Sequence, residues 1–465
     1  MLTDNPEFRR NLWLSATPGV LATVPLVTGA IFLTVGVMTK DYADFMGAMS
    51  YICILGLSVT LLVVGAKMMS DSLAGEVTAR TWDSQRMTSL SPGRMTAGKL
   101  FGSTILCWYT AAVLVPFFLW AASERGFLDR GVIFVVNTIL SGVLIQAVCG
   151  IAVLAEMRRA PQGMGIKHSG LYLIIGVIFL VQSLPSAFNF LEPNMRMGEG
   201  ILKWYSIEFP AGTFQMLSYA VFAFWAVYGL YRNMRVELLH ENGPWAWVFF
   251  VLTCMVYTGG FGVEDNVPFR VSAYNVFFLA FVTAASWTYL MAFSEPKNPV
   301  DVKSLLEKYR EGDLVTFFRR IPRWILSLAL AALACLGVLA FFPAYTRDYG
   351  LSFLAGAGPL LALAILVFMV RDIGIIFFWY MKPNPRRPDV AILVTFLVAY
   401  GILPLVVSAG GESTKALGMF MPVLKGPAVL RLVPALVMAA GAWWLALKRF
   451  KALIAPNKLP YSTFV

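Results

Sequence analysis

One segment of the chain has the spacing of a nucleotide-binding loop. Residues Gly93–Lys99 read GRMTAGK, which satisfies the pattern G-x-x-x-x-G-K. A phosphate-binding loop follows a β-strand and has Ser or Thr directly after its lysine to hold magnesium. Here Leu100 takes that position and opens an apolar run, and no strand pattern precedes the segment. We therefore predict that this segment does not bind nucleotide and that the isolated chain is not an ATPase.

Other catalytic and metal-binding patterns are weak. The only histidines are His168 and His240, and all five cysteines fall inside apolar runs. This predicts neither a disulfide framework nor a metal site, and we find no Ser–His–Asp set or carboxylate pair. The polar residues inside the apolar runs are mainly amides, such as Asn137, Gln146 and Asn275. Ion-coupled carriers usually have charged groups there, so we expect these amides to hydrogen-bond between helices.

Composition indicates that membrane spans position these residues. Of 465 residues, 58% are hydrophobic and only 14% are charged, whereas soluble domains carry about 25% charged residues. This excludes a water-soluble enzyme, and the high hydrophobicity excludes a disordered chain. A helix needs roughly 20 apolar residues to cross a bilayer. The sequence contains twelve such runs, which predicts an all-α polytopic membrane protein with about 12 transmembrane helices.

The basic residues indicate the orientation. The net charge is +11, and an even number of spans places both termini on one side. Roughly three quarters of the 37 Lys and Arg residues fall on that side, which is cytoplasmic by the positive-inside rule. We therefore expect an integral protein of the bacterial cytoplasmic (inner) membrane with both termini cytoplasmic. Nucleic acid is not needed to explain the basic excess.

Three segments on the cytoplasmic side have helical character. Asn5–Trp13 predicts a short helix lying in the membrane interface. Asp71–Lys99, between spans 2 and 3, predicts a helix that is either covered by another protein or solvated. Asn298–Arg323 predicts two amphipathic helices at the membrane surface: Asn298 caps the first, Gly312 ends it, and Asp313 caps the second.

Residues 1–231 resemble the permease subunit of ATP-binding-cassette (ABC) transporters of the type-2 export family. In that family an interfacial helix with an NP start precedes span 1, and NPEFRR at Asn5–Arg10 matches it. The family segment between spans 2 and 3 reads roughly E-x-x-x-G-T-L-E, then leucine, proline and GK. Arg80 stands where the family usually has glycine. The matching positions are Glu76, Arg80, Thr81, Trp82, Asp83, Leu90, Pro92, Gly98 and Lys99.

The resemblance implies a transport subunit that is not itself an enzyme and holds no cofactor or metal. ATP and magnesium would belong to a separate cytoplasmic ABC ATPase subunit. The segment between spans 2 and 3 would couple to that subunit, and we expect Trp82, Arg80 and Arg86 to be its exposed anchors. The candidate coupling residues are Glu76, Arg80, Thr81, Trp82, Asp83, Arg86, Leu90, Pro92 and Lys99. The segment between spans 5 and 6 would form an outer gate with Trp204, Tyr205 and Phe209.

Residues 232–465 form a second six-span half in this interpretation. Asn298-Pro299 and the span that follows imitate Asn5-Pro6 and span 1, which suggests a diverged partial repeat. Only four spans follow the second NP, so coincidence remains open. The segment Arg371–Asp389, between spans 10 and 11, would be a second coupling site. Its candidate residues are Arg371, Asp372, Arg386 and Arg387.

These features favour the permease subunit of an ABC exporter. Its expected partners are the ATPase subunit, the lipid bilayer and a second permease copy or homologue; no nucleic acid is expected. Two alternatives stay open, an ion-coupled secondary transporter and a non-transporting membrane scaffold. The near absence of charges inside the spans argues against the first alternative.

Overall fold

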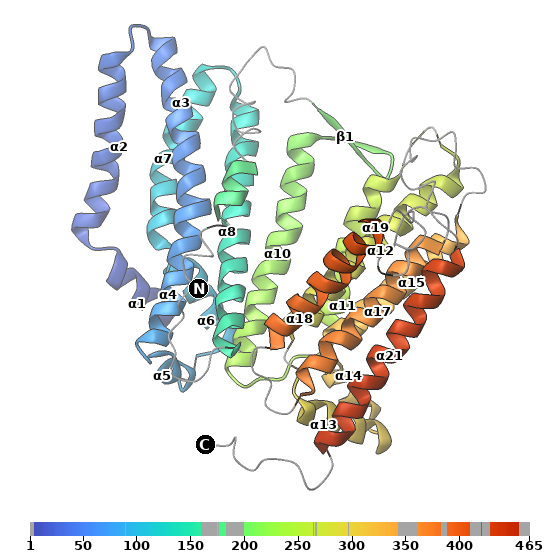
Figure 1. Ribbon diagram of the computed structural model, residues 1–465. Coiled ribbons are helices and arrows are strands. Elements are labelled where there is room, and N and C mark those ends of the chain that lie inside the picture. Colours follow the sequence, from blue (N-terminus) through green and yellow to red (C-terminus); the bar gives the residue numbers. More distant parts are fainter. Residues whose placement is uncertain are drawn as a thin grey trace. The chain divides into compact units, whose positions relative to one another are not determined.

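The chain is helical along most of its length in this computed structural model (Figure 1). The structure describes residues 4–88, 90–159, 174, 176–182, 200–263, 265, 267–295, 297–342, 360–382, 388–409, 420 and 428–454. Within these residues, eleven helices are long and apolar enough to cross a membrane. The prediction of an all-α polytopic membrane protein is thus confirmed. The predicted fifth span, Leu171–Leu191, lies largely outside the described residues.

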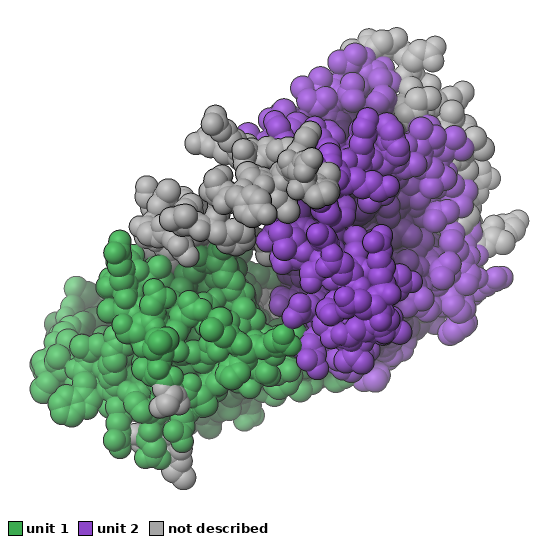
Figure 2. Space-filling view, turned by 90° about the horizontal axis from the view of Figure 1, so that it is seen from below, with its two compact units in different colours: residues 1–202, 208–242 green, residues 203–207, 243–465 purple. Residues whose placement is uncertain are grey.

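The chain divides into two compact units, coloured separately in Figure 2. Unit 1 comprises residues 1–202 and 208–242, and unit 2 comprises residues 203–207 and 243–465. The division falls after residue 242, whereas we predicted it after residue 231. The later division reflects the last helix of unit 1, which continues to Glu237. Beyond that helix, Asn242 donates its side-chain amide back to the carbonyl of Arg232 at 2.7 Å.

The described part of unit 1 consists mainly of helices. In chain order they are α1 (Pro6–Ser15), α2 (Pro18–Met38), α3 (Tyr42–Ser58), the π-helical η2 (Val59–Val64), α4 (Gly65–Thr78), α5 (Trp82–Arg86), α6 (Pro92–Ala97), the π-helical η3 (Gly98–Gly102), α7 (Ile105–Glu124), α8 (Leu128–Arg159) and α10 (Ala211–Glu237). A hairpin of β1 (Ile201–Trp204) and β2 (Ile207–Pro210) precedes α10.

Span 2 is longer than the sequence suggests. The sequence predicts a span over Met46–Val64, but α3, η2 and α4 form one continuous helix from Tyr42 to Thr78. The π-helical turn in its middle is supported from α8, because the Gln146 amide donates to the Leu61 carbonyl at 3.2 Å. This contact between helices is what we expected of the buried amides.

Two buried apolar clusters hold unit 1 together. One joins α3 and α7 with parts of α2 and α8. The other joins α4, α5, α6 and η3 to α8 and α10, and it includes Leu73, Met95 and Leu230. The second cluster fixes the segment between spans 2 and 3 against its own unit.

Unit 2 has its own apolar cluster, formed mainly by α11, α12, α15 and α17. Its elements are α11 (Trp245–Gly259), the 3₁₀ turn η5 (Gly260–Gly262), α12 (Phe269–Ser294), α13 (Pro299–Arg310), α14 (Leu314–Arg320), α15 (Arg323–Ala340), α17 (Leu360–Tyr380), α18 (Pro388–Leu397), the π-helical η6 (Val398–Ile402), α19 (Leu403–Ala409) and α21 (Ala428–Ile454).

The predicted caps of α13 and α14 are confirmed. The Asn298 side chain accepts from the Val300 amide at 3.2 Å, and the Asp313 side chain accepts from the Thr316 amide at 3.1 Å. Gly312 lies between the helices with a φ of +76°, a conformation that favours glycine because it has no Cβ.

Candidate functional site

The helix α1 lies against η3 through two glycines. A Cβ added to Gly98 would lie 2.7 Å from Glu7 Cβ, and one added to Gly102 would lie 3.1 Å from Asn11 Cβ. The two glycines are four positions apart, and small residues at this spacing allow helices to approach closely. The glycine of the GK pair is therefore needed for contact with α1.

Replacing Gly98 with Val should displace α1. Overpacked contacts typically cost about 1–3 kcal/mol, and a displaced α1 would leave its backbone open to solvent. We expect faster hydrogen exchange over residues 5–15 in Gly98→Val. Gly75→Val is the control, because a Cβ at Gly75 in α4 meets open space. Unchanged exchange in Gly98→Val would show that α1 does not depend on this contact.

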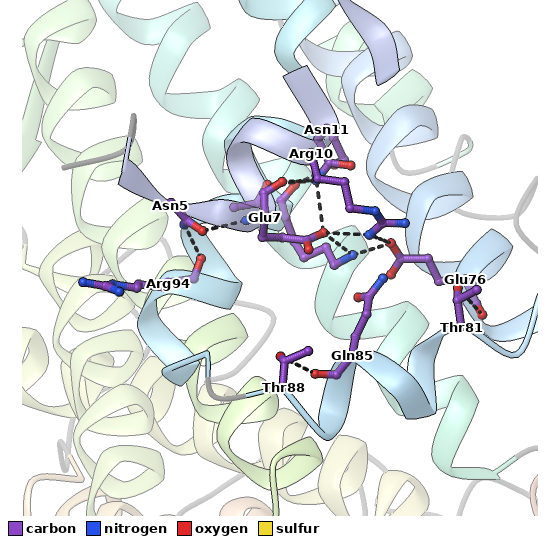
Figure 3. A network of polar contacts seen from close by, with 12 residues as sticks. Asn5, Glu7, Arg10, Asn11, Glu76, Thr81, Gln85, Thr88 and Arg94 are labelled. Atoms are coloured by element: carbon purple, nitrogen blue, oxygen red, sulfur yellow. Dashed lines mark hydrogen bonds and ion pairs between the residues drawn. The ribbon is translucent and has the colours of Figure 1, made fainter. Parts of the chain in front are cut away.

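Next to Gly98, the Lys99 side chain lies in a buried group of charges. Lys99 is fully buried (0% exposed), and its ammonium pairs with Glu7 Oε1 at 2.7 Å and with Glu76 Oε1. Arg10 contacts the same two oxygens, at 3.3 Å and 3.1 Å. Figure 3 shows Glu7 and Arg10 of α1 turned toward Glu76 of α4. We call these four residues the Lys99 network.

The Lys99 network is balanced in charge and adds hydrogen bonds to the glycine contact. It contains two carboxylates and two cations, of which Glu7, Glu76 and Lys99 are buried and Arg10 is exposed. Asn11 supports it by donating to the Glu7 backbone oxygen at 3.0 Å and to Glu7 Oε1 at 3.2 Å. The network therefore joins α1, the far end of span 2 and the start of span 3.

The segment with phosphate-loop spacing has a structural explanation. Gly93–Lys99 folds as α6 and the first residues of η3. The Ser91 side chain caps α6 by accepting from the Arg94 amide at 3.4 Å, and the Lys99 ammonium is occupied by two carboxylates.

The turn after α4 explains a position where this chain differs from the family pattern. Arg80 has a φ of +56°, in the left-handed region that favours glycine. The Arg80 amide donates to the Val77 carbonyl at 3.1 Å, and the Thr81 amide to the Glu76 carbonyl at 3.0 Å. These two bonds are the Schellman motif of helix ends, which usually has glycine at this position.

The expectation of an exposed Trp82 anchor was wrong. Trp82 is only 4% exposed and packs with α4, α8 and α10 in the second apolar cluster. Arg80, Thr81 and Asp83 are exposed, as an interface would need. Met87, which we did not predict, is 89% exposed.

The remaining predicted coupling residues are partly covered. Arg86 donates from Nε to the Glu237 carbonyl at 2.8 Å and lies 3.6 Å from Asp83. Leu90 and Pro92 are half-buried. Glu76 and Lys99 belong to the buried network and not to the surface.

The second coupling segment was also misplaced. Arg371 and Asp372 do not lie in a loop between spans, because they are inside α17, which continues to Tyr380. They are 3% and 2% exposed, so they cannot form a surface for a partner. Arg386 and Arg387 lie outside the described residues.

Arg371 and Asp372 form a buried polar cluster with two tyrosines. The Arg371 guanidinium donates to Asp372 Oδ1 from Nε at 2.9 Å and from Nη2 at 2.8 Å, and to the Phe420 carbonyl at 3.2 Å. Asp372 Oδ2 accepts from Tyr289 of α12 at 2.9 Å and from Tyr400 of η6. No sequence pattern indicates the two tyrosines, because nothing local relates them to α17. We call these four side chains the Asp372 cluster.

The proposed gate residues Trp204 and Tyr205 lie at the tip of the hairpin. Trp204 donates to the Tyr257 carbonyl and Tyr205 to the Val256 carbonyl, each at 3.0 Å. Tyr205 and Ser206 both have positive φ, as a tight two-residue hairpin turn requires. Phe209 lies on β2 and contacts Phe214 at 5.8 Å between ring centres. Their role as a gate stays a prediction.

No protein-family model, curated protein or solved structure matches this chain.

Proposed function

We propose that the chain is the membrane-spanning permease subunit of an ABC exporter, driven by ATP hydrolysis in a separate subunit. The observation that carries this proposal is the Lys99 network at the end of an extended span 2. The continuous helix Tyr42–Thr78 has 37 residues, so at 1.5 Å per residue it is about 55 Å long. The bilayer core is about 30 Å thick. Roughly 25 Å of rigid helix is therefore available outside the core.

This extension offers a path for mechanical coupling. A partner that moves the α4–α6 region would move Glu76, and the Lys99 network would pass that motion to α1 and to the start of α7. Both neighbours lead directly into spans, because α2 begins at Pro18 and α7 at Ile105. ATP and magnesium would be held by the partner, and a second permease copy or homologue would complete the pathway.

The docking surface is proposed to lie at the tip of this extension. Arg80, Thr81, Asp83 and Met87 are among its exposed side chains. We expect Met87→Glu to weaken binding to the proposed ATPase subunit by about thirtyfold. This corresponds to a hot spot of about 2 kcal/mol. Co-purification and equilibrium binding of the two subunits measure the effect.

Trp82→Ala is the matched control for Met87→Glu. Because Trp82 is buried in its own unit, its truncation should lower the free energy of unfolding by about 3–5 kcal/mol. The affinity of the folded fraction for the partner should remain. If Met87→Glu binds normally and Trp82→Ala loses only partner affinity, the surface is wrongly assigned.

We propose that both termini face the cytoplasm. The basic asymmetry of the loops supports this orientation. A reporter that works only in the cytoplasm should be active when it is fused after Val465, and a periplasmic reporter should be inactive there. Activity of a periplasmic reporter at that position would contradict this orientation of the C-terminus.

One observation favours the ion-coupled transporter as a second candidate. Ionisable residues inside spans often mark ion pathways, and Arg371 and Asp372 lie within a candidate span. However, both oxygens of Asp372 already accept two hydrogen bonds each. Transport that survives ATP depletion but stops with an uncoupler would favour this candidate over the ABC permease.

A further inference from the structure

The helices α13 and α14 of unit 2 expose apolar side chains. Neither helix contains a buried residue. On α14, Leu314, Val315 and Phe318 are 50%, 73% and 53% exposed. We call these three residues the apolar trio. They lie just before Arg323, where the membrane-span helix α15 begins.

Exposed basic side chains accompany the trio in the same unit. Arg319 and Arg320 end α14, and Lys448 and Lys451 lie in the last turns of α21; all four are exposed. We call these four residues the basic rim. Neither α14 nor α21 contains an acidic residue. The helix α13 contacts both α14 and α21, and Figure 1 shows it beside the end of α21 that leads to the C-terminus.

Most of the acidic residues nearby interact with close neighbours in the sequence. On α13, Lys303 lies 3.8 Å from Glu307, and Lys308 lies 2.7 Å from Glu311. Asp313 accepts from the Thr316 amide as the cap of α14. Residues 299–320 carry five basic and four acidic side chains, and Lys448 and Lys451 of α21 add two more cations, so the charge of this surface is positive.

The position of the two helices relative to the spans is fixed by Glu295. This residue directly follows α12, and its two carboxylate oxygens accept from the Arg323 amide at 3.0 Å and 3.1 Å. The chain therefore leaves span α12 and enters span α15 at the same level. Because spans end at the edge of the apolar core, α13 and α14 begin and end at that edge.

We propose that α13, α14 and the end of α21 form a binding surface for anionic phospholipids. The apolar trio enters the boundary between headgroups and acyl chains. The basic rim contacts the lipid phosphates, and juxtamembrane cations gain about 1 kcal/mol each near an anionic surface. This proposal does not depend on whether an ATPase drives the protein.

Hydrogen exchange of the full chain in nanodiscs tests the proposal. Exchange over residues 299–320 should be at least about fivefold slower in phosphatidylcholine discs that contain phosphatidylglycerol than in phosphatidylcholine alone. Fivefold corresponds to one basic contact. High salt should reduce the difference in the unmodified protein, since it screens exposed charges.

Two variants identify the side chains responsible. Arg319→Ser combined with Arg320→Ser should remove most of the difference between the lipids. Lys303→Ser, an exposed lysine already paired with Glu307, should keep it. Equal exchange in the two lipids for the unmodified protein would overturn the proposal. So would protection that is the same in both lipids and arises only after the ATPase subunit is added, because the surface would then bind a protein.

Discussion

Lys99→Met is expected to destabilise unit 1 by about 3–5 kcal/mol, the usual cost of removing one partner from a buried ion pair. The variant keeps most of the side-chain volume but leaves Glu7 and Glu76 facing each other. They are 5% and 8% exposed, and only Arg10 remains to balance them. Denaturant titration of the purified protein in detergent measures the loss in the free energy of unfolding.

The control is a lysine in the same long helix. Lys67 forms an exposed pair with Asp71, and exposed pairs contribute only about 0–1 kcal/mol. Lys67→Met should therefore leave the stability nearly unchanged. A restoring variant, Lys99→Met with Glu76→Gln, should recover part of the loss because it removes one of the unbalanced charges.

The same variant tests the interpretation of the GRMTAGK segment. We expect the isolated chain to hydrolyse no ATP, and Lys99→Met to change coupling or assembly without changing nucleotide affinity. Tight ATP binding by the isolated chain that disappears in Lys99→Met would contradict this interpretation of the segment. A Lys99→Met variant as stable as the unmodified protein would contradict the structural role of the Lys99 network.

Asp372→Leu is expected to have a similar effect on unit 2, again about 3–5 kcal/mol. It leaves the Arg371 guanidinium inside the helix cluster without its carboxylate partner, although the bond to the Phe420 carbonyl remains. It also removes the acceptor of Tyr289 and Tyr400, which come from two other helices. Denaturant unfolding in detergent measures the change.

A double variant separates the ion pair from its surroundings. Arg371→Met with Asp372→Leu should recover most of the stability, since apolar residues of similar volume often replace buried pairs without loss. Glu307→Ala, in the exposed pair with Lys303, is the control and should cost less than about 1 kcal/mol. If Asp372→Leu remains fully stable but loses uncoupler-sensitive transport, Asp372 acts in ion coupling and the second candidate function gains support.

The sequence alone determined the fold class and the helix caps. Long apolar runs require spanning helices, because lipid leaves no other partner for the backbone, and eleven of the predicted spans have a matching helix. Asn298, Gly312 and Asp313 were placed correctly because a cap acts within a few residues of its own position.

Only the tertiary structure decided which polar residues are buried together. Lys99 gave a phosphate-loop spacing, yet its partners Glu7 and Glu76 lie far from it along the chain and no local pattern relates them. Trp82 looked like an interface anchor because an aromatic residue in a polar segment has the same pattern whether it faces a partner or its own unit.

Arg371 and Asp372 show most clearly why the sequence alone could not predict the extent of this span. Hydropathy counts two charges there, which ended the predicted span at Val370, although the helix continues to Tyr380. A guanidinium and a carboxylate that bond each other carry no net charge, and two tyrosines from other helices complete the carboxylate's hydrogen bonds. That neutralisation depends on packing between α12, α17 and η6, so it exists only once the helices have assembled.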